Sequence, residues 1–294
     1  MQLQTARVGA RFVPDVSTLD QIAPEDFTRL ASLVTRQTGI KLPPAKRLMI
    51  EGRLRKRMRA VNKPNLTAYC RFLFDEGGLD SEITHLIDVV TTNKTDFFRE
   101  PEHLHFMENH MVDALLAQPR RRPLLKVWSA ASSNGAEAWS IAMVLEDVLR
   151  RRRDFSYAIL GTDISTIVLA QARRAIYPAE VMDPVPRDKR QRYVMDSRTP
   201  ELRGEVRIVP ELRRCARFDR MNLMDTNYPY DRDVDIIFLR NVLIYFEKAD
   251  QEAVVSRLVG HLRPGGYLVV GHSESMVVVE ANVRQVGPTI FQKS

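Results

Sequence analysis

Apolar residues recur every three or four positions through the first third of the chain, and this spacing predicts helices. Phe27, Leu30 and Val34 follow it after Pro24, and Gly39 is placed to end that first helix. The same pattern predicts further helices over residues 44–61, 66–75 and 81–90. We therefore expect a loose, flexible arm over residues 1–20 and an all-helical domain over residues 21–90.

After residue 124 the pattern changes to apolar strands that alternate with helices. The strands are expected over residues 124–130, 158–164, 216–223, 234–240 and 267–271. Helices are expected from near residue 101 and over residues 137–150, 165–175 and 249–262. The alternation predicts an α/β domain over residues 101–294, with a parallel sheet and right-handed crossovers. The tail is expected to add an antiparallel pair over residues 277–283 and 288–292.

Two segments fall outside this alternation. Residues 91–100 link the two domains, and residues from about 192 to 215 form a short hairpin-like insertion before the third core strand. The insertion is either a surface loop or a docking subdomain near the mouth of the functional site.

Composition places the chain among ordinary globular proteins. It has 294 residues, of which 44% are hydrophobic and 28% charged, and no apolar run approaches the roughly 18–20 residues of a membrane span. Cys70 and Cys215 lie far apart and have no disulfide or metal-ligand spacing. We therefore expect a cytoplasmic protein with no metal site and no membrane insertion.

Positive charge is concentrated near the N-terminus. The chain carries a net charge of +7, yet residues 29–63 contain eleven Lys or Arg residues and one acid, Glu51. Such a block indicates an acidic partner, which can be nucleic acid, an anionic membrane surface or an acidic protein. The alternative is a solvated helix face with no partner.

The segment from Leu124 to Ala142 carries the most informative chemistry. Its strand ends in the small-residue turn 129–135, and Glu137 lies in the first turn of the helix that follows. Small residues let the backbone approach a ligand, and the next strand ends at Asp163, where a carboxylate can accept from ribose hydroxyls. The pattern predicts a nucleoside-cofactor crevice. Alternatively, Glu137 only stabilises the helix dipole and Asp163 only caps the next helix.

The same turn indicates which cofactor is bound. It contains one glycine, Gly135, and so lacks the G-x-G-x-x-G pattern that a pyrophosphate requires. S-adenosylmethionine has no phosphate and carries a positive sulfonium and an ammonium group, for which carboxylates such as Glu137 are suited. We therefore predict S-adenosylmethionine as the cofactor.

Other polar residues follow the remaining strands. Asn222 and Leu223 can bracket an adenine ring, and Arg240 and Asn241 end the fourth strand and should face the crevice, although Asn241 can also be a structural cap. The linker, residues 91–100, is placed to fold over the cofactor. The alternative is a linker packed only by its two phenylalanines.

Six segments occur in a characteristic order: TTNKTDFFRE, WSAASSNGAEAWSIAM, GTDIS, MNL, FLRNVLIYF and LRPGGYLVVGHSES. From about Pro24 onward the chain resembles the CheR family, the chemotaxis-receptor glutamate methyltransferases. The resemblance implies a helical N-terminal domain, a class I, Rossmann-like S-adenosylmethionine-dependent methyltransferase sheet and a small inserted β-subdomain. It also implies S-adenosylhomocysteine as product and glutamate side chains of methyl-accepting chemoreceptors as acceptors.

The resemblance also implies roles for individual residues. Arg99 and Tyr245 are expected to be catalytic, Arg99 by holding the closed pocket and Tyr245 by orienting the methyl group or the acceptor. The basic residues expected to meet the acidic helices of the receptor's cytoplasmic domain are Arg53, Arg55, Lys56, Arg57 and Arg59. The expected cofactor contacts are Asn93, Thr95, Arg99, Glu137, Asp163, Asn222, Leu223, Arg240 and Asn241.

The expected reaction needs no general base, because a glutamate with a pKa of about 4.3 is already an anion at neutral pH. A nucleic-acid methyltransferase is disfavoured, since the fourth strand ends in LRNVLIYF rather than an Asn/Asp-Pro-Pro-aromatic motif. A cofactor-binding sensor or adaptor with little transfer activity is the other alternative, because Ala136 stands where the family usually has an acid. We expect a monomeric enzyme recruited to membrane receptor arrays.

Overall fold

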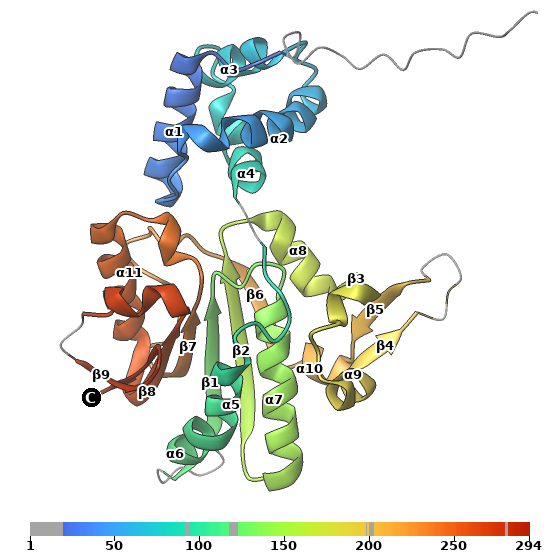
Figure 1. Ribbon diagram of the computed structural model, residues 1–294, viewed down its shortest axis with the longest axis vertical. Coiled ribbons are helices and arrows are strands. Elements are labelled where there is room, and N and C mark those ends of the chain that lie inside the picture. The colour runs from blue at the N-terminus through green and yellow to red at the C-terminus, as the bar shows by residue number, and fades with distance from the viewer. Residues whose placement is uncertain (1–19, 92–93, 118–122, 198, 200–202, 280–281) are drawn as a thin grey trace, which may run out of the picture.

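Figure 1 shows a computed structural model in which a helical domain lies above a larger domain built on a sheet. The structure describes residues 20–294 apart from 92–93, 118–122, 198, 200–202 and 280–281. Residues 1–19 of the predicted arm, and Asn93 of the predicted site, lie outside the described residues. Within the described part, no helix combines the length and apolar character that crossing a membrane would demand.

The helical domain packs its helices around one apolar core, in which Leu30, Val34, Ile50 and Leu54 are fully buried. The first helix ends where the sequence predicts, because Gly39 adopts a left-handed conformation with φ 73°. The four predicted helices are confirmed, the second one beginning with a 3₁₀ turn. Their bounds are α1 (Pro24–Thr38), η2 (Pro44–Lys46), α2 (Arg47–Ala60), α3 (Leu66–Phe74) and α4 (Leu79–Val90).

Two buried glutamates of this domain are paired with arginines. Glu82 accepts two hydrogen bonds of 2.6 Å from the Arg57 guanidinium and one of 3.1 Å from the Tyr69 hydroxyl. Glu51, the single acid of the basic segment, accepts from Arg47 Nε at 3.0 Å. Because an unpaired buried carboxylate is strongly destabilising, these two arginines serve the fold.

The larger domain is a seven-stranded sheet with the strand order β6-β2-β1-β7-β8-β10-β9. Neighbours from β6 to β8 are parallel, and β10 and β9 close the sheet with antiparallel pairings. The bounds are β1 (Leu124–Ala130), β2 (Ser156–Asp163), β6 (Ala216–Arg220), β7 (Val234–Leu239), β8 (Leu262–Val270), β9 (Val283–Gly287) and β10 (Ile290–Lys293).

Successive residues of the central strands enter two different apolar cores, one on each face of the sheet. Val127 of β1 belongs to the core that includes helix α7, and Trp128 belongs to the core that includes helix α11. The flanking helical segments are α5 (Pro101–Phe106), η3 (Met107–Met111), α6 (Val112–Leu116), α7 (Ala136–Arg152), α8 (Thr166–Arg174), η6 (Leu243–Tyr245), α11 (Lys248–His261) and η7 (His272–Val277). The predicted parallel α/β sheet is confirmed.

The structure corrects the ends of several elements. The first strand of the tail pair lies at Val283–Gly287, later than the predicted 277–283, because Val277 belongs to the 3₁₀ helix η7. Strand β6 ends at Arg220 rather than residue 223, and β8 begins at Leu262 rather than residue 267.

The insertion is a three-stranded antiparallel sheet with the order β3-β5-β4. Its first strand has only three residues and follows α8 directly, so the β-structure begins well before the predicted start near residue 192. The bounds are β3 (Ile176–Pro178), η4 (Ala179–Met182), α9 (Arg187–Tyr193), β4 (Val194–Asp196), β5 (Glu205–Ile208) and α10 (Pro210–Arg213).

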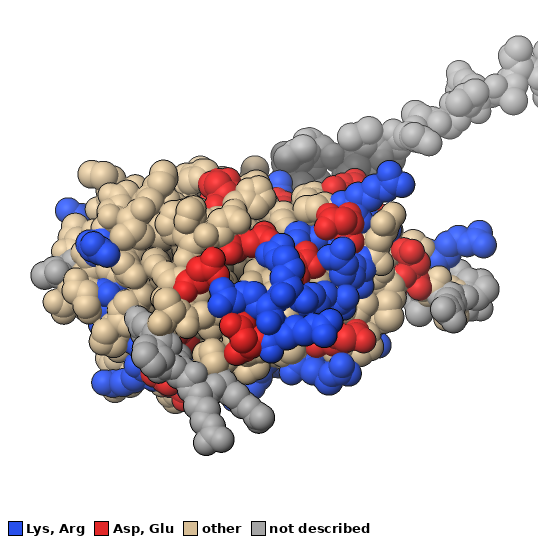
Figure 2. Space-filling view, turned by 90° about the horizontal axis from the view of Figure 1, so that it is seen from below, with Lys and Arg blue, Asp and Glu red and all other residues tan. Residues whose placement is uncertain are grey.

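Basic residues also gather at the end of the molecule opposite the helical domain, with acids around them (Figure 2). Helix α7 ends there with Arg150, Arg151 and Arg152, which favourably meet the negative end of the helix dipole. Arg151 pairs with Glu108 at 2.7 Å, and Arg152 also pairs with nearby acids. The arginines of this helix end are therefore largely balanced within the fold.

Candidate functional site

A cavity of about 1170 Å³, including the solvent at its open mouth, lies at the carboxyl ends of the central strands. It adjoins the point where the strand order reverses between β1 and β7, the usual position of a ligand in an open α/β sheet. The helical domain contributes Thr38, Ile40 and Lys46 to its lining. The predicted site residues that line it are Thr95, Arg99, Glu137, Asp163, Asn222, Leu223, Arg240, Asn241 and Tyr245.

The turn after β1 brings backbone close to the cavity. Ala131 and Ser133 both adopt positive φ values, 59° and 50°, before Gly135 at 88°. The Ser132 N–H donates to the Thr162 carbonyl at 2.8 Å, which ties the turn to the end of β2. Left-handed backbone at non-glycine residues is uncommon and is found at binding sites, so this turn is held in a special shape.

Asp163 ends β2 and is almost fully buried, at 7% exposure. Its Oδ2 accepts from the Ser133 N–H and its Oδ1 from the Ser165 N–H, both at 2.9 Å. Burial raises the pKa of Asp163, and the backbone N–H groups act against that rise. A carboxylate has about four acceptor positions, so this residue has capacity left for ribose hydroxyls.

Glu137 lies in the first turn of α7, and each of its two carboxylate oxygens has a partner. Its Oε1 accepts from the Ser129 hydroxyl at 2.6 Å, and its Oε2 lies 3.4 Å from an Arg240 guanidinium nitrogen. Burial raises the pKa of Glu137, while Arg240 and Ser129 lower it, and the net shift is upward. Ser129 is a partner that the sequence did not single out.

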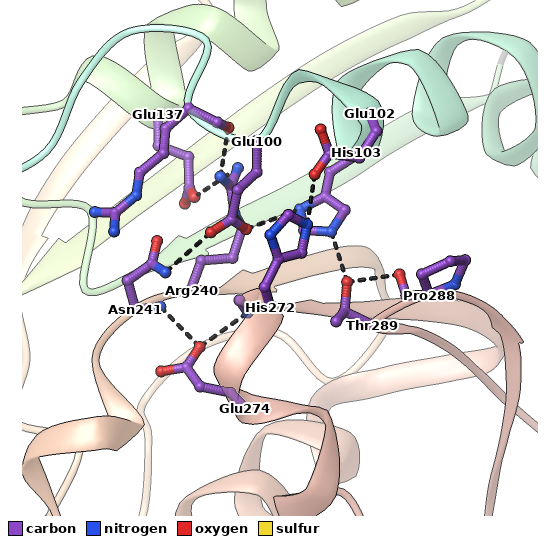
Figure 3. A network of polar contacts seen from close by, with 12 residues as sticks. Glu100, Glu102, His103, Glu137, Arg240, Asn241, His272, Glu274, Pro288 and Thr289 are labelled. Atoms are coloured by element: carbon purple, nitrogen blue, oxygen red, sulfur yellow. Dashed lines mark hydrogen bonds and ion pairs between the residues drawn. The ribbon is translucent and has the colours of Figure 1, made fainter.

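Arg240, which follows strand β7, contacts the linker (Figure 3). Its Nε lies 3.4 Å from Glu100 Oε2, and another guanidinium nitrogen donates to the Arg99 carbonyl. The Asn241 amide donates to Glu100 Oε1 at 3.1 Å. Burial raises the pKa of Glu100, but Asn241 and Arg240 lower it, and the net shift is downward. The end of the linker is therefore bound to the two residues that follow β7.

The linker also contacts α7. The Phe98 N–H donates to the Ser140 hydroxyl at 3.0 Å, and this hydroxyl donates to the Ala136 carbonyl at 2.7 Å. Phe97 is fully buried and meets the Tyr177 ring edge-on at 5.2 Å. The linker is thus packed by its phenylalanines and also contributes to the cavity, because Phe98 and Arg99 both line it.

Asn222 serves a contact between the domains. Its amide nitrogen donates to the Gln37 carbonyl at the end of α1, at 2.6 Å, and its Oδ1 accepts from the Met224 N–H at 3.0 Å. Leu223 follows it in the cavity wall. Any cofactor contact by Asn222 therefore uses an amide that is already anchored.

Tyr245 and Arg99 occupy the mouth of the cavity. The Lys46 ammonium lies 5.1 Å from the centre of the Tyr245 ring, which places a cation from the helical domain beside this aromatic. The Arg99 side chain is exposed. Lys46, Lys94 and Arg99 line the cavity beside one acid, Asp96, so the lining that the helical domain and the linker contribute carries a net positive charge.

The basic residues of α2 differ in environment. Arg53 donates to the carbonyls of Val89 and Thr91, Arg55 donates to the Asp20 carbonyl, and Arg57 is paired with Glu82 as described above. Of the predicted receptor-binding residues, Lys56 and Arg59 are exposed. These two are the most accessible to a partner.

Glu100, His103 and His272 offer possible metal ligands within 4.8 Å of one another. Tetrahedral zinc ligands lie closer, at roughly 3.4 Å from one another. Arg240 already lies against Glu100, and His272 lies 2.6 Å from Glu102. The cluster in this arrangement suits an ion-pair network better than a metal ion.

Two family descriptions cover almost the whole chain. Residues 25–91 match "CheR methyltransferase, all-alpha domain", and residues 93–291 match "CheR methyltransferase, SAM binding domain". The chain belongs to the CheR methyltransferase family. It is 35% identical over 267 residues to "Chemotaxis protein methyltransferase 2" of Pseudomonas aeruginosa, which covers 91% of this chain and 92% of that protein. It is 36% identical over 270 residues to the "Chemotaxis protein methyltransferase" of Salmonella typhimurium, which covers 91% of this chain and 90% of that protein.

These findings confirm the predicted family, fold class and cofactor. This CheR family member binds S-adenosylmethionine, and the residues present fit that group. Asp163 has acceptor capacity for the ribose, and Glu137 offers a partly buried carboxylate to a cationic ligand. The roles of individual residues remain predictions.

Proposed function

We propose that this CheR family member methylates glutamate side-chain carboxylates of chemoreceptors and forms glutamate methyl esters. The observation that carries the proposal is the excess of cations in the cavity lining from the helical domain and the linker, where Lys46, Lys94 and Arg99 outnumber Asp96 and Lys46 lies beside Tyr245. An anionic acceptor is attracted to such a lining. Curated relatives are named chemotaxis protein methyltransferases, which supports a receptor as the acceptor.

The proposed chemistry is a displacement by an acceptor that is already charged. A glutamate carboxylate with a pKa of about 4.3 is anionic at neutral pH and needs no general base. The bound cofactor supplies a methyl group on a sulfonium. The acceptor oxygen forms a bond to the methyl carbon as the carbon–sulfur bond breaks, and S-adenosylhomocysteine is released.

The protein's own contribution is to position and desolvate the reacting groups. Positioning of this kind is worth up to about 7–11 kcal/mol. Glu137 and Asp163 would hold the cofactor, Arg99 would keep the pocket closed, and Tyr245 would orient the carboxylate. We propose that the enzyme acts as a monomer in the cytoplasm, recruited to membrane receptor arrays.

Transfer of a tritiated methyl group from S-adenosylmethionine to receptor-rich membranes tests the function. We expect label that mild base releases as methanol and that is absent with the Asp163→Ala variant. Base-stable label would overturn the ester chemistry. Cofactor binding without transfer to several receptors would instead favour the sensor or adaptor, which the buried Ala136 in place of an acid motivates.

The basic face of α2 is proposed to meet the acidic receptor helices. Replacing the exposed Lys56 and Arg59 together by Gln should lower the rate of receptor methylation by about tenfold at low salt, because exposed charges mainly speed encounter. Affinity for S-adenosylhomocysteine should not change. Equal loss of methylation and cofactor affinity would contradict this role. Arg57→Gln is the contrasting variant, since it breaks the pair with Glu82 and should lower stability.

A further inference from the structure

Glu274 is a buried carboxylate that does not line the cofactor cavity. It lies in η7, after strand β8, and only 1% of it is exposed. Its Oε2 accepts from the backbone N–H groups of Asn241 at 2.7 Å and Gly271 at 2.8 Å, and its Oε1 accepts from Leu243 N–H at 2.8 Å. Figure 3 shows this side chain directed at the segment that leaves β7.

These hydrogen bonds to the carboxylate all come from backbone N–H groups. Among the described residues, no Lys or Arg forms an ion pair with Glu274, unlike Glu51, Glu82 and Glu137, which each have an arginine. Closely spaced backbone N–H groups that converge on one anion form an anion-binding nest. Here the chain itself supplies the anion, 33 residues after Asn241.

The nest is formed by the segment that builds the cavity. Arg240, Asn241, Val242 and Tyr245 line the cavity, and the N–H groups of Asn241 and Leu243 point the other way, toward Glu274. Asn241 adopts a left-handed conformation with φ 58°. A non-glycine residue keeps such a conformation only where its surroundings hold it. The Glu274 carboxylate is one such restraint on that backbone.

The packing at Gly271 gives independent evidence that Glu274 and Asn241 are in tight contact. A Cβ added there would lie 2.7 Å from Glu274 Oε2 and 2.7 Å from the Asn241 amide nitrogen. The backbone at Gly271 has an ordinary φ of −69°, so space rather than backbone conformation requires glycine. The end of β8, the carboxylate and the cavity segment therefore fit together with no room for a methyl group.

We propose that Glu274 is a positioning residue that holds the segment Arg240–Tyr245 in its cofactor-binding shape. It acts through the backbone of Asn241 and Leu243 and does not itself touch the cofactor. The proposal concerns cofactor binding alone, so it is independent of which acceptor receives the methyl group.

The Glu274→Gln variant of the full chain tests the proposal. Glutamine keeps the shape but has only one acceptor atom, so its NH₂ group must face either the Leu243 N–H or those of Asn241 and Gly271. We expect the Kd for S-adenosylhomocysteine, measured by calorimetry, to rise at least tenfold. In the methylation assay the KM for S-adenosylmethionine should rise by a similar factor while the KM for the receptor changes less than twofold.

Asp235→Asn is the matched control. Asp235 is a fully buried carboxylate near the start of β7, the strand that Arg240 follows, where it accepts from the Lys126 N–H at 2.8 Å and from Arg263. It lies at the end of the strand away from the cavity. The Asp235→Asn variant should have a lower thermal midpoint, but its Kd for S-adenosylhomocysteine should stay within twofold of that of the unmodified chain. If Glu274 were important for stability alone, Glu274→Gln would give this same result.

A second variant keeps the proposal testable if Glu274→Gln does not fold. Gly271→Ala leaves the carboxylate in place and inserts a methyl group between it and Asn241. We expect the same rise of at least tenfold in the Kd for S-adenosylhomocysteine. If a folded Glu274→Gln protein, or in its place a folded Gly271→Ala protein, binds S-adenosylhomocysteine within twofold of the unmodified chain, the proposal is wrong.

Discussion

The floor and the roof of the cavity are built differently. The floor consists of Asp163, Glu137 and Arg240, whose polar groups meet backbone groups or each other inside the sheet domain. The roof comes from the helical domain, and hydrogen bonds join it to the sheet domain. The Asn222 amide reaches the Gln37 carbonyl, and the Lys41 N–H donates to the Tyr245 carbonyl at 3.0 Å.

Apolar packing shows the same difference. The helical domain has its own core, separate from the two cores of the sheet domain, and Ile40 packs against both its own core and the one beside α11. Large buried apolar areas resist separation, whereas a few polar contacts separate at lower cost. We therefore expect the floor to be preorganised and the roof to be the part that moves when the cofactor enters or leaves.

Replacing Asp163 should have the largest effect on cofactor affinity, because it removes a carboxylate from the floor. Asp163→Ala deletes the ribose acceptor and leaves the Ser133 and Ser165 N–H groups without their partner. Losing hydrogen bonds to a charged group costs about 1.5–3 kcal/mol each, so we expect the Kd for S-adenosylhomocysteine to rise by at least about 100-fold. Isothermal titration calorimetry measures this change.

Asp219→Ala is the control for that variant. Asp219 lies on the neighbouring strand β6, opposite Thr162, and pairs with Arg217 outside the cavity. Its replacement should leave cofactor affinity unchanged. A similar loss of affinity in both variants would mean that the end of the sheet, and not the Asp163 carboxylate, carries the effect.

Acid should destabilise the sheet domain through His103 of α5, which lies in the network around Arg240. This side chain is 1% exposed, and burial together with Arg240 lowers its pKa to about 4, while Glu100 and Glu102 oppose the shift and His272 adds to it slightly. The unfolded chain therefore binds a proton more readily between about pH 6.5 and 4. The stabilisation is complete above that window and is lost as pH falls through it.

For this single group the loss between pH 7 and pH 5 amounts to about 2 kcal/mol. Urea unfolding of the intact chain and of His103→Gln at both pH values isolates it, because glutamine can still donate to the Thr289 hydroxyl. The variant should be less stable at pH 7 and lose about 2 kcal/mol less on acidification. Equal losses in the two proteins would refute the assignment to His103.

The sequence was informative where chemistry follows local pattern. Asp163 and Glu137 could be predicted because a strand end and a helix start each place a side chain in the crevice. Contacts between distant residues were not visible: Glu274 meets Asn241 across 33 residues, and Asn222 meets Gln37 across 185. The three-residue strand β3 was missed because it is too short to show an alternation.

The smallest expected effect comes from loosening the roof at Asp88. This residue of α4 accepts from the Thr166 N–H at 2.7 Å and from the Thr166 hydroxyl at 2.6 Å, and so caps the start of α8 from the other domain. Losing a cap costs about 1 kcal/mol, which corresponds to roughly a fivefold change in an equilibrium between closed and open domains. Asp88→Ala should therefore speed release of S-adenosylhomocysteine by up to about fivefold in stopped-flow displacement.

Asp80→Ala separates this effect from a general weakening of α4. Asp80 lies in the first turn of the same helix and is exposed, so its loss should leave the release rate unchanged. Hydrogen exchange gives a second measure, because opening at Asp88 should raise exchange in the first turn of α8 and leave the turn after β1 protected. If hydrogen exchange rises equally in both segments, the floor opens together with the roof, and the proposed difference between the two regions is wrong.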